Sequence, residues 1–371
     1  MQSTHALSLK PQKILVIALR YLGDVLLTTP LLHALRLAYP AAQVHVLVYA
    51  ETAAILAGNP DINQIITTPN RPKRADYQQL LPKLFRQYDL ALATQSGDRP
   101  FWYSLLAAPR RIAAVPPKKS TGWWKRGFMH AWVEFDDEQT HTVLQHLKLL
   151  DSLGIDYAYD LVAPQLEAAE QLTLRQRYPA LIAPTRYAVL HPYPRWTYKH
   201  WTLENWIAIG NYLSKAGLTV VLSGGAGQDE QAYVAAIADK LPQPTLNLAG
   251  AVSLAELTAV IASASVFIGP DTGVTHLAAA TGVPVIALYG PTNPVKWAPW
   301  PKNYRQNSNP FQRVGSQQVH NIYLCQGQVA AGCVPCHLEG CDRHGESRSE
   351  CLDKLAYVQL TPLIDQILNA P

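Results

Sequence analysis

The sequence predicts an α/β protein made of two Rossmann-like, doubly wound domains that face a central cleft. The chain has 371 residues, enough for two domains of ordinary size. Short apolar runs alternate with helical patterns, and the alternation restarts in the second half. Continuous apolar strands separated by helices are typical of parallel sheets covered on both faces. Facing domains would bring the carboxyl ends of both sets of strands to a shared cleft, where ligands bind.

The first set of elements predicts an N-terminal domain over residues 1–165. Its expected elements are a strand over Lys13 to Leu19, a helix over Asp24 to Ala38, a strand over Val44 to Tyr49, a helix over Tyr77 to Arg86 and a strand over Leu90 to Ala93. The prolines and polar residues of Asp160 to Pro184 suit an interdomain connection, and we place the linker at residues 166–183.

The second set predicts a C-terminal domain over residues 184–371. Ser253 and Glu256 form a capping box ahead of one of its helices, and Gly217 closes another. The expected strands are Tyr187 to Leu190, Leu218 to Leu222, Ser265 to Ile268 and Val283 to Tyr289, and the expected helices are Leu203 to Ala216, Gln228 to Lys240, Leu254 to Ala262, His276 to Ala280 and Gln359 to Leu368.

Composition narrows the class of protein. Hydrophobic residues make up 48% of the chain and charged residues 16%, which is a globular composition. No apolar run approaches the roughly twenty residues that span a bilayer, and the N-terminus lacks the apolar stretch of a secretory signal, so we expect a cytoplasmic protein. The net charge of +4 suits an anionic substrate or a membrane surface. No nucleic-acid-binding motif accompanies it.

The stretch from Gly269 to Pro294, GPDTGVTHLAAATGVPVIALYGPTNP, is built like a loop that receives a phosphorylated ligand. A helix that begins straight after a strand leaves its first N–H groups unpaired at the sheet edge, where they can bind anions. Thr272 and Thr275 add hydroxyls, Gly273 permits close approach, and His276 adds a donor that can carry charge. The loop predicts a site for a nucleotide or nucleotide-sugar diphosphate. The alternative is an ordinary turn whose Asp and Thr only cap the helix.

A second candidate site follows the first strand, in LRYLGDVLLTTPLLHAL from Leu19 to Leu35. Gly23 allows a tight strand-to-helix turn and places Asp24 at the helix start, at the mouth of the expected cleft. A carboxylate there can act as a general base toward an incoming hydroxyl. The alternative is a helix-start charge that interacts only with the helix dipole.

The pairing of these two motifs resembles glycosyltransferase family 9, the ADP-heptose:lipopolysaccharide heptosyltransferases, over nearly the whole chain. The resemblance implies a GT-B fold and an inverting transfer of heptose from ADP-heptose to the Kdo-bearing inner core of lipopolysaccharide at the inner membrane. It assigns the base to Asp24 and the donor site to Asp271, Thr272, Gly273, Val274, Thr275 and His276. It also matches Lys199, in HPYPRWTYKHW, to a lysine that follows the first strand of the second domain.

Lys199 also has a physical reason to act at this site. An ammonium near a leaving diphosphate stabilises the charge that develops as the glycosidic bond breaks. The alternative is a solvated lysine ahead of a helix capped by Thr202. Further expected donor contacts are Tyr193, Ser223, Gly224 and Val252. Because no DxD-type metal motif lies near the donor loop, we expect metal-independent transfer, with ADP-heptose as co-substrate and no further cofactor.

Basic residues of the first domain predict the acceptor side. Such clusters suit a phosphorylated lipopolysaccharide core, although most surface cations are only solvated. Trp123 and Trp124 suit a membrane interface, and His141 matches a family histidine at a helix start, where it either faces the acceptor or only begins the helix. The acceptor candidates are Gly23, Arg71, Lys73, Arg74, Arg99 and His141, and further basic residues are Arg110, Arg111, Lys118, Lys119, Lys125 and Arg126.

Five cysteines, at 325, 333, 336, 341 and 351, fall near the C-terminus. Comparable segments in the family make Cys333, Cys336, Cys341 and Cys351 a candidate structural site, held by metal or disulfide. A reducing cytoplasm favours free or metal-bound thiols. Two other functions stay open: a two-domain enzyme that uses another nucleotide sugar, such as a UDP-sugar transferase or epimerase, and a non-catalytic nucleotide-sugar binding protein.

Overall fold

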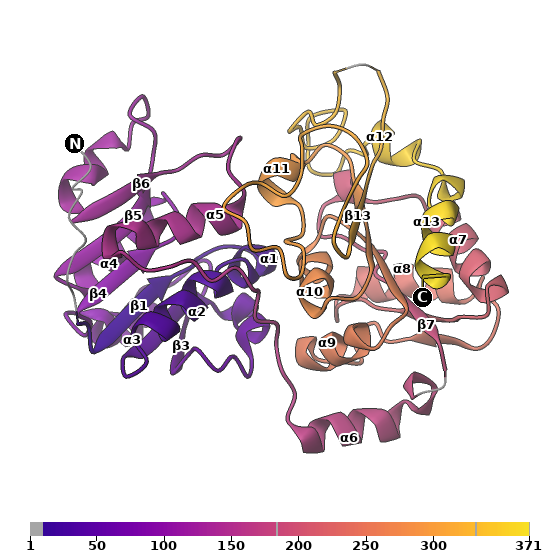
Figure 1. The fold of residues 1–371 in the computed structure, drawn as a ribbon, viewed down its shortest axis with the longest axis horizontal. Helices are drawn as coiled ribbons and strands as arrows, with labels where there is room; N and C mark the ends of the chain where they lie inside the picture. The colour runs from indigo at the N-terminus through magenta and orange to yellow at the C-terminus, as the bar shows by residue number, and fades with distance from the viewer. Residues whose placement is uncertain (1–9, 183–184, 331, 371) are drawn as a thin grey trace. The chain divides into compact units, whose positions relative to one another are not determined.

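A computed structural model gives the structure of the protein and describes residues 10–182, 185–330 and 332–370 (Figure 1). The chain forms two compact units. The first runs to Pro164 and includes Arg305–Asn309, so a short segment of the second half belongs to it. The second comprises Gln165–Tyr304 and the chain from Pro310 onward.

The first unit is a six-stranded parallel sheet in the order β3-β2-β1-β4-β5-β6. Leu15 and Ile17 pack with Leu84 in one cluster, whereas the alternating Ile14 and Val16 are also fully buried, so both faces of the sheet are covered. The strands are β1 (Lys13–Ile17), β2 (Gln43–Tyr49), β3 (Gln64–Thr68), β4 (Leu90–Ala93), β5 (Arg110–Val115) and β6 (Ala131–Glu134). The helices are α1 (Leu22–Leu26), α2 (Thr29–Ala38), η1 (Ala50–Leu56), α3 (Arg74–Leu84), α4 (Asp98–Ala107), η2 (Trp123–Phe128), α5 (Thr142–Leu147) and η3 (Lys148–Leu153).

The second unit is a seven-stranded sheet in the order β12-β13-β11-β10-β7-β8-β9, parallel except for the edge strand β12. Its strands are β7 (Tyr187–Leu190), β8 (Thr219–Leu222), β9 (Thr245–Asn247), β10 (Val266–Pro270), β11 (Val285–Tyr289), β12 (Gln317–Val319) and β13 (Ile322–Gln326). Its helices are α6 (Ala168–Arg177), η4 (Pro179–Leu181), η5 (Thr197–Lys199), α7 (Leu203–Lys215), α8 (Gln228–Ala238), α9 (Leu254–Ala262), α10 (Gly273–Thr281), α11 (Pro294–Trp297), α12 (Glu350–Asp353), η6 (Tyr357–Gln359) and α13 (Thr361–Leu368).

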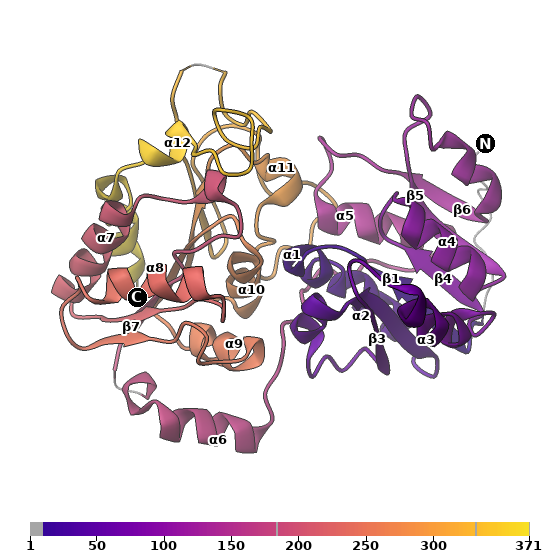
Figure 2. The ribbon, with the colours of Figure 1, turned by 180° about the vertical axis from the view of Figure 1, so that it is seen from behind.

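Alternate residues of the second sheet belong to two different cores. Ala188 and Leu190 pack with α7, α8 and α13, whereas Val189 between them packs with α6, α9 and α10. Figures 1 and 2 show α7, α8 and α13 together on one side of this sheet and α9 with α10 on the other. The predicted α/β class with two doubly wound sheets is therefore confirmed. The arrangement of the units about a central cleft stays a prediction.

Both sheets reverse their winding direction at one point, and these points position the candidate residues. In the first unit the winding changes between β1 and β4, and in the second between β7 and β10. Loops that leave the carboxyl ends of such adjacent strands diverge to opposite faces and leave a crevice at the sheet edge. We therefore expect the ligand-binding and catalytic residues in the loops after β1, β4, β7 and β10.

Several expected elements have other boundaries. The helix expected over Asp24 to Ala38 is two helices, α1 and α2, because Pro30 has no N–H to continue the ladder and the Thr29 hydroxyl takes the Leu26 carbonyl at 2.7 Å. The expected linker contains α6, whose Leu174 is buried in the second unit. By contrast β4, β7 and α9 match at both ends, and the capping box of Ser253 and Glu256 is formed.

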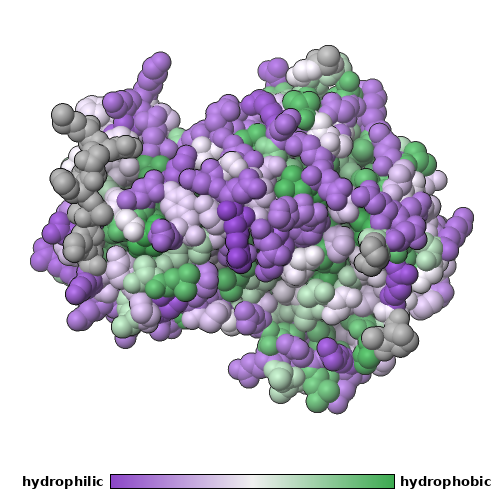
Figure 3. Space-filling view, viewed as in Figure 1, coloured by the Kyte–Doolittle hydropathy of each residue, from purple (hydrophilic) through white to green (hydrophobic). Residues whose placement is uncertain are grey.

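The remaining expected elements differ from the structure by a few residues at their ends. The strand expected from Lys13 ends at Ile17, and the helix expected over Tyr77 to Arg86 is α3, which begins and ends earlier. The helix expected over His276 to Ala280 begins at Gly273, because Thr272 already caps it. Within the described ranges no helix is both long and apolar enough to cross a membrane. On the face drawn in Figure 3, hydrophobic residues form separate patches between hydrophilic ones.

Candidate active site

A buried carboxylate, Asp271, lies at the switch point of the second sheet. It follows β10, and its Oδ2 accepts a hydrogen bond from Lys199 Nζ at 2.5 Å, from the loop after the adjacent β7. Thr292 Oγ1 donates to the same oxygen at 2.7 Å, and the Tyr289 hydroxyl donates to Oδ1 at 3.2 Å. Two expected site residues, Asp271 and Lys199, are thus in direct contact.

The surroundings set the ionisation of this group. Burial alone would raise the pKa of Asp271, but the charge and hydrogen bond of Lys199, with help from Thr292, hold that pKa below its usual value. His276, one helical turn further on, is buried and its pKa falls to about 4, chiefly because burial disfavours the charged ring. The expectation that His276 can carry charge is therefore wrong for this state near neutral pH. The ring is neutral, and its buried Nδ1 has no hydrogen-bond partner among the described residues.

The turn into α10 is held by its own threonines. Thr272 is the N-cap residue and accepts from Thr275 N at 3.3 Å, while the Thr275 hydroxyl is fully buried and donates to the Pro270 carbonyl at 2.5 Å. The Thr275 hydroxyl is therefore used inside the turn, and its contact with a donor stays a prediction. Gly273 begins the helix, and Val274 packs into the core. The backbone N–H groups of Gly273 and Val274, which begin the helix, stay the predicted anion-binding feature of this loop.

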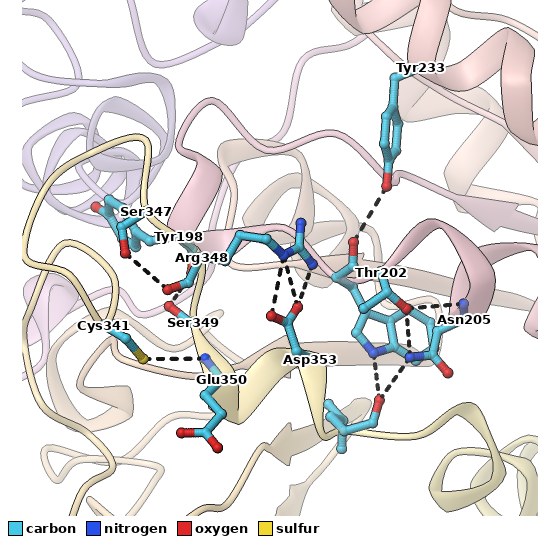
Figure 4. Close-up of polar contacts among 12 residues, drawn as sticks. Tyr198, Thr202, Asn205, Tyr233, Cys341, Ser347, Arg348, Ser349, Glu350 and Asp353 are labelled. Atoms are coloured by element: carbon cyan, nitrogen blue, oxygen red, sulfur yellow. Dashed lines mark hydrogen bonds and ion pairs between the residues drawn. The ribbon is translucent and has the colours of Figure 1, made fainter.

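The loop that carries Lys199 is fastened to the C-terminal segment (Figure 4). Ser349 Oγ donates to the Tyr198 carbonyl at 2.6 Å, and Trp201 Nε1 donates to the Leu355 carbonyl at 2.6 Å. Arg348, which precedes Ser349, makes an ion pair with Asp353. Because contacts with the C-terminal segment bracket Lys199, its backbone is held in place opposite β10.

The other expected donor residues lie at the same edge of the second sheet. Ser223 follows β8, and its buried hydroxyl bonds to His191 Nδ1 at 3.1 Å and to the Leu190 carbonyl, so it supports the β7 loop. A Cβ at Gly224 would lie 3.1 Å from Ala249, which shows how tightly the loop packs. The Tyr193 ring stacks edge-on against His200 and Tyr233. Val252 packs against the core beside α9.

In the first unit, Gly23 and Asp24 lie in the first turn of α1, directly after β1. Gly23 is buried and Asp24 is partly exposed. The Thr28 hydroxyl donates to the Asp24 carbonyl at 3.0 Å. The neighbouring β4 loop is fixed by Gln95, whose Oε1 accepts from Leu19 N at 2.9 Å. The structure therefore places Asp24 at the switch point of its own sheet, in a loop that is tied to the next one.

Arg99 links three of the loops at this edge. Its guanidinium donates to the Asn70 carbonyl at 2.8 Å, beside Arg71, and to the Tyr49 hydroxyl at 3.1 Å. Arg71, Lys73 and Arg74 are exposed on the segment between β3 and α3. The acceptor candidates Arg99, Arg71, Lys73 and Arg74 thus share the carboxyl edge with Asp24.

His141 has the helix-starting position that we expected as one of its two roles. It is fully buried, its Nδ1 accepts from Val143 N at 3.1 Å as the N-cap of α5, and its own N–H donates to Asn309 at 2.9 Å. Helix capping is therefore a sufficient reason for a histidine at position 141. Contact with an acceptor stays a prediction.

All five cysteines are free thiols. Burial, and to a lesser degree the nearby Cys336, Cys341 and Cys333, raise the pKa of the Cys351 thiol to about 12. Among the described residues, no group of three or more His, Cys, Asp or Glu side chains is arranged to hold a metal ion. A structural metal and metal-independent transfer both stay predictions.

Sequence reasoning missed three residues that organise the site: Tyr289, Thr292 and His191. The first two lie inside the quoted stretch from Gly269 to Pro294, in its YGPTNP end, but nothing in their spacing shows that they converge on Asp271. Only their position in the chain could have indicated a role, because both lie at the carboxyl end of β11, the strand adjacent to β10. His191 directly follows β7, and burial lowers its pKa to about 4.

Comparison with known proteins identifies relatives of this chain. The profile of glycosyltransferase family 9 (heptosyltransferase) matches residues 81–327, more than half of the chain. The chain is 33% identical over 297 residues to lipopolysaccharide heptosyltransferase 3 of Escherichia coli (strain K12), covering 78% of this chain and 85% of that protein.

Two solved structures share the fold. The crystal structure of a family 9 glycosyltransferase from Veillonella parvula superimposes with a TM-score of 0.77 over 98% of this chain and 99% of that one, at 18% identity. The E. coli heptosyltransferase WaaC with ADP gives a TM-score of 0.69 over 96% and 99%, at 20% identity.

Proposed function

Because the chain belongs to glycosyltransferase family 9, we propose that it transfers heptose from ADP-heptose, with inversion, to the inner core of lipopolysaccharide. The observation that carries this proposal is the Lys199 ammonium, held by Asp271 beside the N-terminus of α10. A cation and a row of helix N–H groups at one sheet edge suit a diphosphate. ADP bound to the related WaaC supports ADP as the nucleotide.

The proposed reaction is a direct displacement. Asp24 removes the proton of an acceptor hydroxyl, the hydroxyl oxygen attacks the anomeric carbon, and the bond from that carbon to the diphosphate oxygen breaks as ADP leaves. Lys199 offsets the charge that grows on the leaving diphosphate. An ammonium has three donor hydrogens, and the bond to Asp271 uses one of them and orients Lys199.

The proposed acceptor is a phosphorylated, Kdo- or heptose-bearing lipid A, met at the cytoplasmic surface of the inner membrane. The basic side chains of Arg71, Lys73, Arg74 and Arg99 at the edge that carries Asp24 support an anionic acceptor. We further propose that transfer needs no metal, since cationic side chains and helix N–H groups already meet the diphosphate. A panel of acceptors that differ in their hydroxyl groups identifies which hydroxyl accepts the heptose.

The test is transfer itself, measured by mass spectrometry with ADP-heptose and a panel of truncated core acceptors, with and without EDTA. We expect a product that gains one heptose. Asp24→Asn should lower turnover by about 10²–10⁴-fold with little change in ADP-heptose affinity, because it removes only the base.

Glu51→Gln is the matched control, since Glu51 is an exposed acid at the start of η1 after the neighbouring β2. Binding of ADP-heptose without turnover on any acceptor would instead favour a nucleotide-sugar binding protein. Turnover of a UDP-sugar in preference to ADP-heptose would favour the other enzyme class.

A further inference from the structure

Four aromatic side chains gather on the first unit, and a fifth, the exposed Trp123, lies next to one of them in the chain. They come from α4 and η2 and are named the aromatic surface: Phe101, Trp102, Trp123, Trp124 and Phe128. Phe101 is buried, with ring centroids of Trp102, Trp124 and Phe128 at 5.1, 5.3 and 6.0 Å. Trp102, Trp123, Trp124 and Phe128 are exposed by 57, 60, 38 and 51%. So much exposed aromatic area in one place marks an interaction surface.

Two cationic side chains of η2, Lys125 and Arg126, fasten the aromatic surface to the rest of the first unit. Lys125 of η2 is buried, donates to the Ser96 carbonyl at 2.9 Å and pairs with Asp98 at 2.7 Å. Arg126 bonds to the Pro116 carbonyl and to Glu134, each at 2.8 Å. These two cations, which we expected on the surface as part of a basic patch, instead fix η2 against the sheet. The rings therefore stand in place before any partner binds, which lowers the entropic cost of binding.

Positive charge is dense in the part of the sequence that carries the rings. Residues 98–130 contain seven Lys and Arg and one Asp, an excess of six positive charges, whereas the whole chain has an excess of four. Lys125 and Arg126 are neutralised by Asp98 and Glu134. Arg110, Lys118 and Lys119 are exposed. The rest of the chain is net acidic, so the basic charge is concentrated in the segment that carries the aromatic surface and is not a general property of the protein.

We propose that the aromatic surface docks on an anionic phospholipid bilayer, with its tryptophans and Phe128 in the interfacial region and Arg110, Lys118 and Lys119 against the headgroups. Trp is the residue type that prefers the boundary between hydrocarbon and water. Basic residues beside such rings add attraction to anionic lipids. The proposal deepens the proposed function, because a lipid-borne acceptor requires the enzyme at a membrane, but the surface stands on its own geometry.

The experiment is sedimentation of the full chain with vesicles of phosphatidylcholine alone and of phosphatidylcholine with phosphatidylglycerol, at low and high salt. We expect binding to the anionic vesicles that weakens with salt. Trp102→Ser together with Trp123→Ser should weaken it on the order of tenfold, and Lys118→Gln together with Lys119→Gln about fivefold for each charge removed. Bromine-labelled acyl chains should quench tryptophan fluorescence in the wild type more than in the Trp102/Trp123 variant.

The matched control is Phe85→Ser, since Phe85 is a 56% exposed aromatic side chain of the same unit outside the aromatic surface. Equal vesicle binding by the tryptophan variant and the wild type would overturn the proposal, as would no binding of the wild type to anionic vesicles. A concentration-dependent dimer that the tryptophan variant abolishes would assign the surface to a second copy instead. Vesicle binding needs neither donor nor acceptor, so this result is independent of whether heptose transfer is observed.

Discussion

Replacing Lys199 with methionine tests whether its ion pair with Asp271 organises the donor loop. Asp271 would keep the hydrogen bonds from Tyr289 and Thr292 but lose its cation. Removing one partner of a buried pair costs about 3–5 kcal/mol. Because the Lys199 side chain is 19% exposed, water can replace part of the loss, and we expect a fall of about 2–3 kcal/mol in the unfolding free energy of the second unit. For a unit of this size, that lowers the melting temperature by about 4–12 °C.

The loss should depend on pH in a defined direction. In the wild type the pKa of Asp271 is lowered, so its ionised form stabilises the fold above the unfolded pKa, and this contribution is lost only as pH falls into the acid range below it. Without Lys199, burial raises the pKa of Asp271, and the buried charge then becomes more costly as pH rises. The difference in melting temperature between wild type and variant should therefore be larger at about pH 8 than at about pH 5.

The assay is thermal unfolding followed by circular dichroism at both pH values, with Lys199→Met, Asp271→Asn and the double variant. Lys215→Met is the control, because Lys215 is an exposed lysine in the last turn of α7. In the double variant the destabilisation should be smaller than the sum of the two single changes, because no buried charge is left unpaired. Equal melting temperatures for wild type and Lys199→Met, or a difference that does not change with pH, would refute the reasoning.

Three further predictions follow from the same packing. Tyr289→Phe removes the hydroxyl whose single proton is shared between the Trp297 carbonyl at 2.7 Å and Asp271 at 3.2 Å, so it should cost about 1–2 kcal/mol in chemical denaturation and raise the KM for the donor more than it lowers kcat. Gly269→Ala would place a Cβ 2.8 Å from the ring of Phe267 and should cost about 1–3 kcal/mol, whereas Gly127→Ala, with nothing within 4 Å, should be neutral in the same measurement. His191 and His276 have folded pKa values of about 4, below the unfolded value, so the melting temperature of the second unit should fall as pH drops from about 6.5 to about 4, and His276→Gln should flatten that slope.

The sequence predicted the fold where the pattern was local. The fully buried strands β4 and β7 are continuous apolar runs, and α9 carries its capping box in the chain itself, so all three were found at both ends. The helix over Asp24 to Ala38 was misjudged because Pro30 follows Thr29 inside an unbroken apolar pattern. The sequence does not predict α6, because most of its residues are exposed and polar and only Leu174 is buried. The helix therefore lacks the apolar periodicity by which a helix is recognised.

The candidate site was predictable residue by residue but not as a network. Asp24, Lys199 and Asp271 each follow a strand, and that position predicts that they lie at the ligand-binding edge of their sheets, whereas their chemical roles stay predictions. Their partners could not be predicted, because Asp271 is bonded to Lys199 from the loop after β7 and to Tyr289 and Thr292 from the end of β11 and the loop after it, and contacts so distant in sequence leave no spacing to detect. Burial has the same effect on His276, whose neutrality is a property of the packed core and not of its neighbours in the chain.

The contacts of Asp271 change what that residue can do for a donor. A carboxylate repels a diphosphate, so its presence at an anion site needs a reason, and here both of its oxygens accept hydrogen bonds from the protein while the side chain is 8% exposed. In the proposed function Asp271 therefore acts through Lys199, whose ammonium it holds beside the first N–H groups of α10. We then expect the cation and the helix start to recognise the phosphate, while the bonds from Lys199, Tyr289 and Thr292 hold the carboxylate in place.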